Sequence, residues 1–166
     1  TEIKSWSGLD TMQIVGQVAN EAKHDRPDEI CVDTIGLGSG VADRLRELGF
    51  NVRDVNVSES SALNPSANKL RDELWLSVKE WLNTRSVRIP NDPQLRQELV
   101  APRYTFSSSG KVIVESKDSL KKRGMRSPDL ADSLCLTFAS TAAGVGGRIT
   151  PWVKGKAIKR KLSGVV

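Results

Sequence analysis

The feature that most constrains the fold is a strand–helix–strand pattern between residues 29 and 57. Residues 29–33 form a short apolar run that ends in a carboxylate, Asp33. A glycine-rich turn at 36–40 then leads into an amphipathic helix that Gly49 closes, and residues 50–57 are a second run of strand type. A further helix begins after Asp10 and stops at Pro27. Strands joined through helices pair in parallel by right-handed crossovers, so the pattern predicts an α/β fold.

The remaining chain adds helices and one hairpin rather than copies of this unit. Apolar spacing predicts helices over 70–82, 92–99 and 127–138, and a short basic helix over 118–123. Asp118 and Ser127 are the expected N-caps of the short basic helix and the last helix, with Pro128 at the first helical position. Residues 104–114 read as a hairpin, and 1–7 and 86–90 as extended segments.

The net charge of +5 is concentrated at one end of the chain. Residues 151–166 contain no acid and five cations, which leaves residues 1–150 formally neutral. We therefore predict a body over 1–145 and a basic tail over 146–166. The tail is either a solvated end or a phosphate-binding segment. Its cations are Lys154, Lys156, Lys159, Arg160 and Lys161.

Several functional classes are disfavoured by what the sequence lacks. No apolar run approaches the ~20 residues that span a bilayer, and the first residues do not have a secretory pattern. We therefore expect a cytoplasmic protein without membrane partners. The glycines at 36, 38 and 40 do not match the dinucleotide-binding spacing, and no P-loop is present. The two cysteines, Cys31 and Cys135, are expected to be reduced core thiols that lie near each other.

Three carboxylates are candidates for chemistry. Asp33 lies where parallel sheets bind ligands, although it could simply cap its own loop. Asp129 and Asp132 are one turn apart near the start of the last helix, where the helix dipole alone would favour acids. The neighbours of Asp132 are apolar, and a carboxylate among core residues is costly unless it is paired or binds a metal. This cost favours a functional role.

A cluster of cations comes just before the last helix. Such a mixture of bases and acids suits a phosphate substrate with a divalent cation, although an exposed basic helix is the plain alternative. Trp75 and Trp81 are more typical of core positions, and His24 of the surface. The clustered cations are Lys117, Lys121, Lys122, Arg123 and Arg126.

Three segments, 33–38, 68–75 and 115–134, occur in an order that resembles the C-terminal nuclease domain of tailed-phage terminase large subunits. The likeness spans about residues 1–143. It implies a ribonuclease H-like mixed sheet flanked by helices, and metal-dependent cleavage of concatemeric double-stranded viral DNA during packaging. It also implies a bacterial host cytoplasm and, as partners, DNA, the terminase ATPase domain, the small terminase subunit and the portal protein.

The resemblance also implies a site. Asp33 and Asp132 would be catalytic and would hold two Mg²⁺ or Mn²⁺ ions, with Asp129 as an auxiliary ligand, while the clustered cations and those of the tail bind DNA. That family places a first catalytic Asp on an earlier strand, so we expect a fold that is N-terminally incomplete. The isolated chain is then either an active nuclease or inactive because that Asp is absent. The alternative is a non-catalytic docking domain that contacts the portal or another partner.

Overall fold

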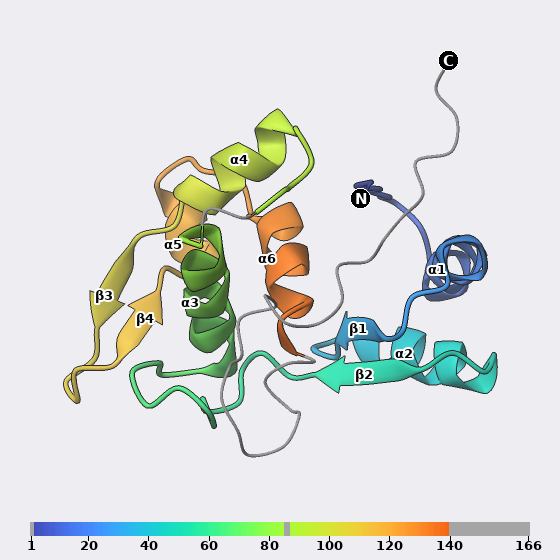
Figure 1. Ribbon diagram of the computed structural model, residues 1–166, viewed down its shortest axis with the longest axis horizontal. Coiled ribbons are helices and arrows are strands. Elements are labelled where there is room, and N and C mark those ends of the chain that lie inside the picture. Colours follow the sequence, from blue (N-terminus) through green and yellow to red (C-terminus); the bar gives the residue numbers. More distant parts are fainter. Residues whose placement is uncertain (1, 85–86, 140–166) are drawn as a thin grey trace.

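The computed structural model describes residues 2–84 and 87–139, which fold into six helices and four short strands within those ranges (Figure 1). In chain order these are α1 (Thr11–Asp25), β1 (Ile30–Asp33), α2 (Gly38–Glu47), β2 (Val52–Val55), α3 (Leu70–Leu82), α4 (Pro93–Val100), β3 (Tyr104–Phe106), β4 (Val112–Val114), α5 (Lys117–Lys122) and α6 (Asp129–Leu136). The predicted α/β class is confirmed.

The first half is the predicted strand–helix–strand unit. β1 and β2 pair in parallel, from Ile30 opposite Val52 to Asp33 opposite Val55. Helices α1 and α2 pack together on one face of this pair, where they form a small apolar core. Asp10 caps α1 through its carboxylate, which accepts the backbone N–H of Gln13 at 2.8 Å. This core is made of Val15, Ala19, Val41 and Leu45, with Ile14, Val18, Ile30, Val32, Phe50 and Val52 against it.

The second half surrounds a larger core between α3, α4 and α6. The β3–β4 hairpin pairs antiparallel and lies beside α3 (Figure 1). Trp81 on α3 meets Phe138 edge-on, with ring centroids 5.5 Å apart. Cys31 and Val57, from the strand–helix–strand unit, also pack against this core, so it joins the two halves. Its buried members are Val55, Leu74, Trp75, Val78, Leu95, Val114, Ala131, Cys135 and Ala139.

Local expectations differ from the structure in three places. Residues 2–7 and 87–90 contain no strand. Ser116 rather than Asp118 caps α5, because the Ser116 hydroxyl accepts the N–H of Ser119 at 3.2 Å. Ser127 does not cap α6: its hydroxyl donates to Asp129 at 2.7 Å instead, and Pro128 takes the N-cap position without a side-chain bond.

The strands of the described ranges form two separate pairs, one parallel and one antiparallel, rather than a continuous mixed sheet. No helix in 2–84 or 87–139 is long and apolar enough to cross a membrane. The predicted tail, 146–166, and the boundary at 145 lie outside the residues that the structure describes, as do the five tail cations.

Candidate metal and nucleic-acid site

Asp33 ends β1, and a tight turn fixes its position. Its carboxylate accepts the N–H of Ile35 at 3.1 Å, so it caps its own loop as the plain alternative expected. Gly36 has a φ of 70°, a conformation that side chains disfavour. Gly38 begins α2 directly against the strand, where a Cβ atom would lie 1.7 Å from the carbonyl oxygen of Asp33. The glycines therefore serve to fold the helix back onto the end of β1.

Asp132 lies in the first turn of α6, and three side chains bind its carboxylate. Trp75 donates its indole N–H at 2.9 Å and Arg71 a guanidinium N–H at 3.3 Å, both to Oδ1. Lys117 Nζ is 3.1 Å from Oδ2. The side chain is only 20% exposed, and these partners offset the cost of placing a charge beside the core.

Lys117 also joins Asp132 to Asp129. Its ammonium donates to Asp129 Oδ1 at 2.9 Å, and Ser127 donates to the same oxygen. Burial works to lower the pKa of Lys117, but the bonds and charges of the two aspartates outweigh it and raise the pKa. For Asp129, burial opposes the change, while Ser127 and Lys117 lower the pKa. Lys117, Asp129 and Asp132 therefore form one ion-paired cluster in the structure.

Asp33 and Asp132 line one small cavity of about 60 Å³. Asp129 does not line it. Instead Asp129 lines a wider groove of about 530 Å³, together with Lys121 and Arg126, and Lys117 lies on the wall of both spaces. The cavity is also lined by Val57, Arg71, Leu74, Cys135 and Leu136.

The chemistry of the cavity suits a hard divalent cation. Mg²⁺ takes carboxylate oxygens and keeps several waters, so one or two carboxylates can hold it weakly. Asp33 and Asp132 each contribute one carboxylate to the lining of the cavity. In the described parts of the chain, no three His, Cys, Asp or Glu side chains are grouped so as to hold a metal. Asp33 and Asp132 therefore fit an ion, such as Mg²⁺, that needs few protein ligands.

The predicted phosphate-binding cations fall into different settings. Lys121 and Arg126 line the groove beside Asp129, and Lys122 is exposed on α5 outside it. Arg123 is already engaged: it binds both oxygens of Glu115, at 2.8 and 2.7 Å, and the carbonyl of Ala101 at 2.9 Å. Arg123 thus holds α5 to its neighbours.

Sequence reasoning missed the residues that support Asp132. Arg71 and Trp75 are one helical turn apart on α3, within a segment that carried the family resemblance but no assigned role. Trp75 is buried as predicted, yet it also donates to the site. Glu98 on α4 is buried, and its carboxylate accepts the N–H groups of Leu130 and Ala131 at 2.7 and 3.0 Å. It thereby caps α6 from another helix.

The cysteines belong to the same side of the molecule. Cys135 is buried in the larger core, and Cys31 packs against that core. Neither forms a disulfide. Burial, followed by the charge of Asp132, raises the pKa of the Cys135 thiol well above its usual range. Cys135 therefore lies beside both carboxylates, because it lines the same cavity, and Cys31 packs against the core to which Cys135 belongs.

Comparison with known proteins identifies the fold. No family profile and no curated protein matches the chain. A mutant nuclease domain of the large terminase subunit gp2 of bacterial virus Sf6, with manganese and beta-thujaplicinol, has a TM-score of 0.64 at 19% identity and covers 81% of this chain and 76% of its own. The large terminase nuclease of thermophilic phage G20c with bound cobalt has a TM-score of 0.62 at 22% identity, over 81% of this chain and 64% of its own.

The same G20c nuclease with bound magnesium matches with a TM-score of 0.56 at 21% identity, over 78% of this chain and 62% of its own. The chain therefore has a ribonuclease H-like fold. Within that class, its fold is that of the nuclease domains of phage large terminase subunits, as the sequence resemblance predicted.

Proposed function

We propose that this chain is the nuclease domain of a phage large terminase subunit and cleaves double-stranded DNA during packaging with the help of a divalent cation. One observation carries the proposal: Asp33 and Asp132, which are 99 positions apart in the sequence, line the same small cavity. The fold likeness adds support, because the related nuclease structures contain manganese, cobalt or magnesium.

In this proposal Asp33 and Asp132 hold the cations, which we take to be two Mg²⁺ or Mn²⁺. Asp129, which lines the adjoining groove rather than this cavity, would be an auxiliary ligand from there. Bound cations would activate a water and stabilise the leaving oxygen of the phosphodiester. Trp75 orients Asp132 through its indole N–H, and Arg71, one turn earlier on the same helix α3, donates to the same oxygen. Arg71 and Trp75 thus hold the Asp132 carboxylate in position before substrate binds.

The wide groove is the proposed track of the DNA backbone. Lys117, Lys121 and Arg126 line it and can bind successive phosphates. Lys122 and the five tail cations are proposed to bind further phosphates, whereas Arg123 contributes less because Glu115 already binds its guanidinium. The ATPase domain, the small subunit, the portal protein and a bacterial host cytoplasm complete the proposed setting.

Metal-dependent nicking of supercoiled plasmid tests the function. The assay compares this chain with a version that carries any residues encoded ahead of Thr1, in Mg²⁺ and in Mn²⁺. We expect Asp33→Asn and Asp132→Asn each to abolish nicking, while Asp28→Asn, an exposed acid on a loop, leaves it unchanged. Equal activity in the two site variants and the control would contradict the assignment.

A non-catalytic docking domain is the second candidate, and one observation favours it. The Asp132 carboxylate is already satisfied by Arg71, Trp75 and Lys117, so the cluster is stable as a structural ion-pair network without a metal. In that case neither the chain nor its N-terminally extended version nicks DNA with Mg²⁺ or Mn²⁺. Calorimetric titration of Mn²⁺ then gives the same heat for the unmodified chain and for Asp33→Asn.

A further inference from the structure

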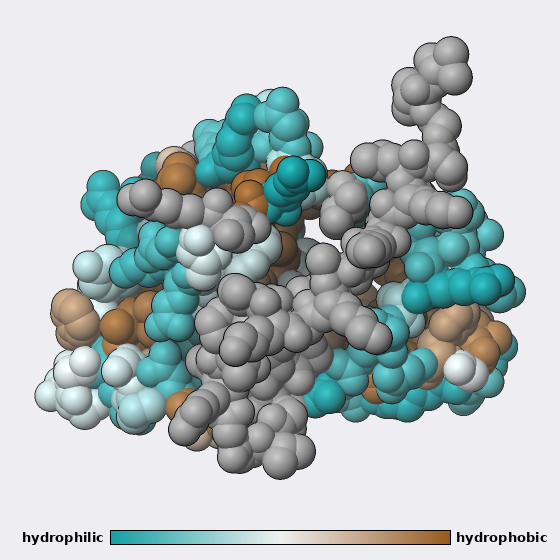
Figure 2. Space-filling model, viewed as in Figure 1, coloured by the Kyte–Doolittle hydropathy of each residue, from teal (hydrophilic) through white to brown (hydrophobic). Residues whose placement is uncertain are grey.

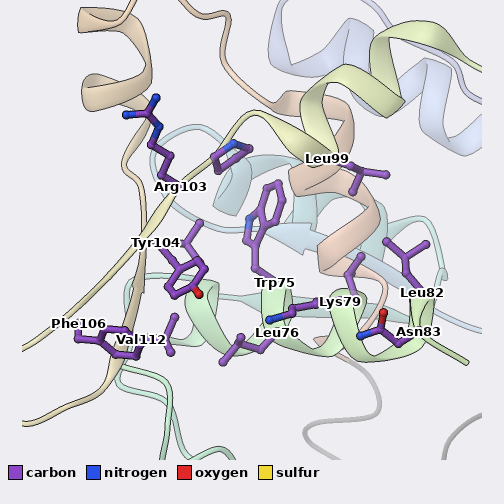
Figure 3. Close-up of a pocket in the computed structure, with 13 residues that line it drawn as sticks. Trp75, Leu76, Lys79, Leu82, Asn83, Leu99, Arg103, Tyr104, Phe106 and Val112 are labelled. Carbon is purple, nitrogen blue, oxygen red and sulfur yellow. The ribbon is translucent and has the colours of Figure 1, made fainter.

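An apolar groove of about 470 Å³ separates α3 from the β3–β4 hairpin (Figure 3). On the hairpin, Tyr104 opposes Val114 and Phe106 opposes Val112, so these four side chains stand on the same face and line the groove. The opposite wall is α3. Helix α3 contributes Trp75, Leu76, Val78, Lys79 and Leu82, and Asn83 follows at its end. Leu99 of α4, and Pro102 and Arg103 after α4, complete the lining.

Large apolar side chains in this groove are left in water. Tyr104 and Phe106 are 60% and 64% exposed, and Leu82 is also exposed. The two rings contact each other edge-on at 5.8 Å. Figure 2 shows apolar surface at the left edge of the molecule, where the hairpin lies. Exposed apolar surface that is gathered in a concave site typically marks a place where another molecule binds.

The rim of the groove has one sign of charge. Of the residues that line it, Lys79 and Arg103 are charged, and both are cationic. Lys79 Nζ lies 5.8 Å from the centre of the Tyr104 ring, and in Figure 3 the guanidinium of Arg103 points outward. An occupant that carried acids beside its apolar residues would match this rim, and one that carried bases would not.

Strand β3 adds backbone groups that can bind a peptide. Within 2–84 and 87–139, β3 pairs only with β4, and all three of its residues are exposed. An extended peptide beside an unpaired edge can gain backbone hydrogen bonds and place alternate side chains in the groove. The apolar wall, cationic rim and unpaired strand together describe a peptide-binding surface.

We propose that this groove docks an apolar segment with acidic flanks from a partner protein. Charge argues against the chain's own end as the occupant, because residues 151–166 carry five cations and no acid. Charge also disfavours a second copy seated symmetrically, since it would bring the cations of both rims together. The proposal does not depend on nuclease activity, because the groove and the carboxylate cavity are separate spaces.

A displayed library of random 16-residue peptides, selected on this chain, tests the proposal. We expect the selected sequences to share large apolar residues beside Asp or Glu. A labelled peptide of that consensus is then titrated by fluorescence anisotropy. Phe106→Ala and Lys79→Glu should each weaken binding by roughly tenfold, the effect of losing one contact of about 1.4 kcal/mol. Higher salt should weaken it further.

Matched controls lie nearby. Thr105→Ala changes the opposite face of β3, and Lys23→Glu reverses an exposed charge on α1; both should leave the affinity unchanged. Trp75 is left intact because it also donates to Asp132. Circular dichroism checks that each variant is folded.

Three results would overturn the proposal. One is a selected consensus without acids, or with bases. The second is peptide binding whose affinity Phe106→Ala and Lys79→Glu do not change, which includes peptide binding at another site from which duplex DNA displaces the peptide. The third is self-association, measured by sedimentation, that Phe106→Ala abolishes, which would make a second copy the occupant. Nicking activity is measured separately, so its loss or absence bears on the proposed nuclease and not on this docking site.

Discussion

Gly38 and Gly40 offer a direct test of how the glycine-rich turn holds Asp33. Both lie in α2, and neither has a positive φ, so backbone conformation alone does not demand glycine at either place. An alanine Cβ at 38 would lie 1.7 Å from the carbonyl oxygen of Asp33, whereas one at 40 would make an ordinary 3.8 Å contact with Thr11. The two substitutions are chemically identical and differ only in what they meet.

The structure sets the expected size of the difference. Because the obstacle is backbone, Gly38→Ala must push the end of β1 away from α2 until the two atoms are at least 3.0 Å apart. Overpacking of this kind typically costs about 1–3 kcal/mol. Gly40→Ala should be neutral or stabilising by up to ~1 kcal/mol, because alanine is the better helix former.

Urea unfolding followed by circular dichroism measures both variants. We expect the midpoint of Gly38→Ala to fall, that of Gly40→Ala to stay or rise, and the slope to be unchanged in each. In the proposed nuclease, Gly38→Ala should also weaken Mn²⁺ binding, because Asp33 moves with the strand. Equal stability of the two variants would refute the claim that close backbone contact requires glycine at 38.

Three further outcomes are expected. Glu98→Ala leaves two helix N–H groups without their buried acceptor and should cost about 2–4 kcal/mol in urea unfolding, while exposed Gln97→Ala on the same helix costs under ~0.5 kcal/mol. Hydrogen bonds from Arg123 first, and then from backbone and hydroxyl donors, lower the pKa of Glu115 to about 2. The stability that this pair contributes is therefore present above pH 4.5 and lost as the pH falls toward 2, and Arg123→Gln should flatten the acid limb of a stability-against-pH curve. The buried Cys135 thiol should resist a thiol reagent at pH 8 in folded protein and react once urea unfolds the chain. Mass spectrometry of the labelled peptides measures this, and labelling of Cys135 in the folded protein would contradict it.

Local patterns in the sequence were sufficient for the elements. The alternation of short apolar runs, glycines and amphipathic stretches predicted β1, α2 and β2 in the right order, because these signals act over a few residues. The helix starts were less predictable. Ser127 has the side chain of an N-cap, but Pro128 takes the N-cap position of α6 and the Ser127 hydroxyl donates to Asp129.

Local sequence patterns predicted the carboxylates of the site but not the residues that support them. Asp33 and Asp132 could be singled out, since each stands at a place where ligands or charges are commonly bound. Their supports could not, because Trp75 lies 57 residues from Asp132 and Glu98 lies 32 from Leu130. Side-chain bonds over such separations depend on how helices pack, and a single sequence does not encode that packing in any local pattern.

The alternation of side chains along β1 explains why the two carboxylates can meet at all. Ile30 and Val32 point toward α1 and α2 and pack in the smaller core, whereas Cys31 points the other way and packs against the larger core. Asp33, two residues after Cys31, is carried to that second face, where Cys135 and Asp132 stand one turn apart on α6. We therefore expect the packing of Cys31 against the core around α6 to influence the separation of the carboxylates. A larger side chain, as in Cys31→Met, should widen the cavity and weaken Mn²⁺ binding in a calorimetric titration, and an unchanged affinity would contradict this role of Cys31.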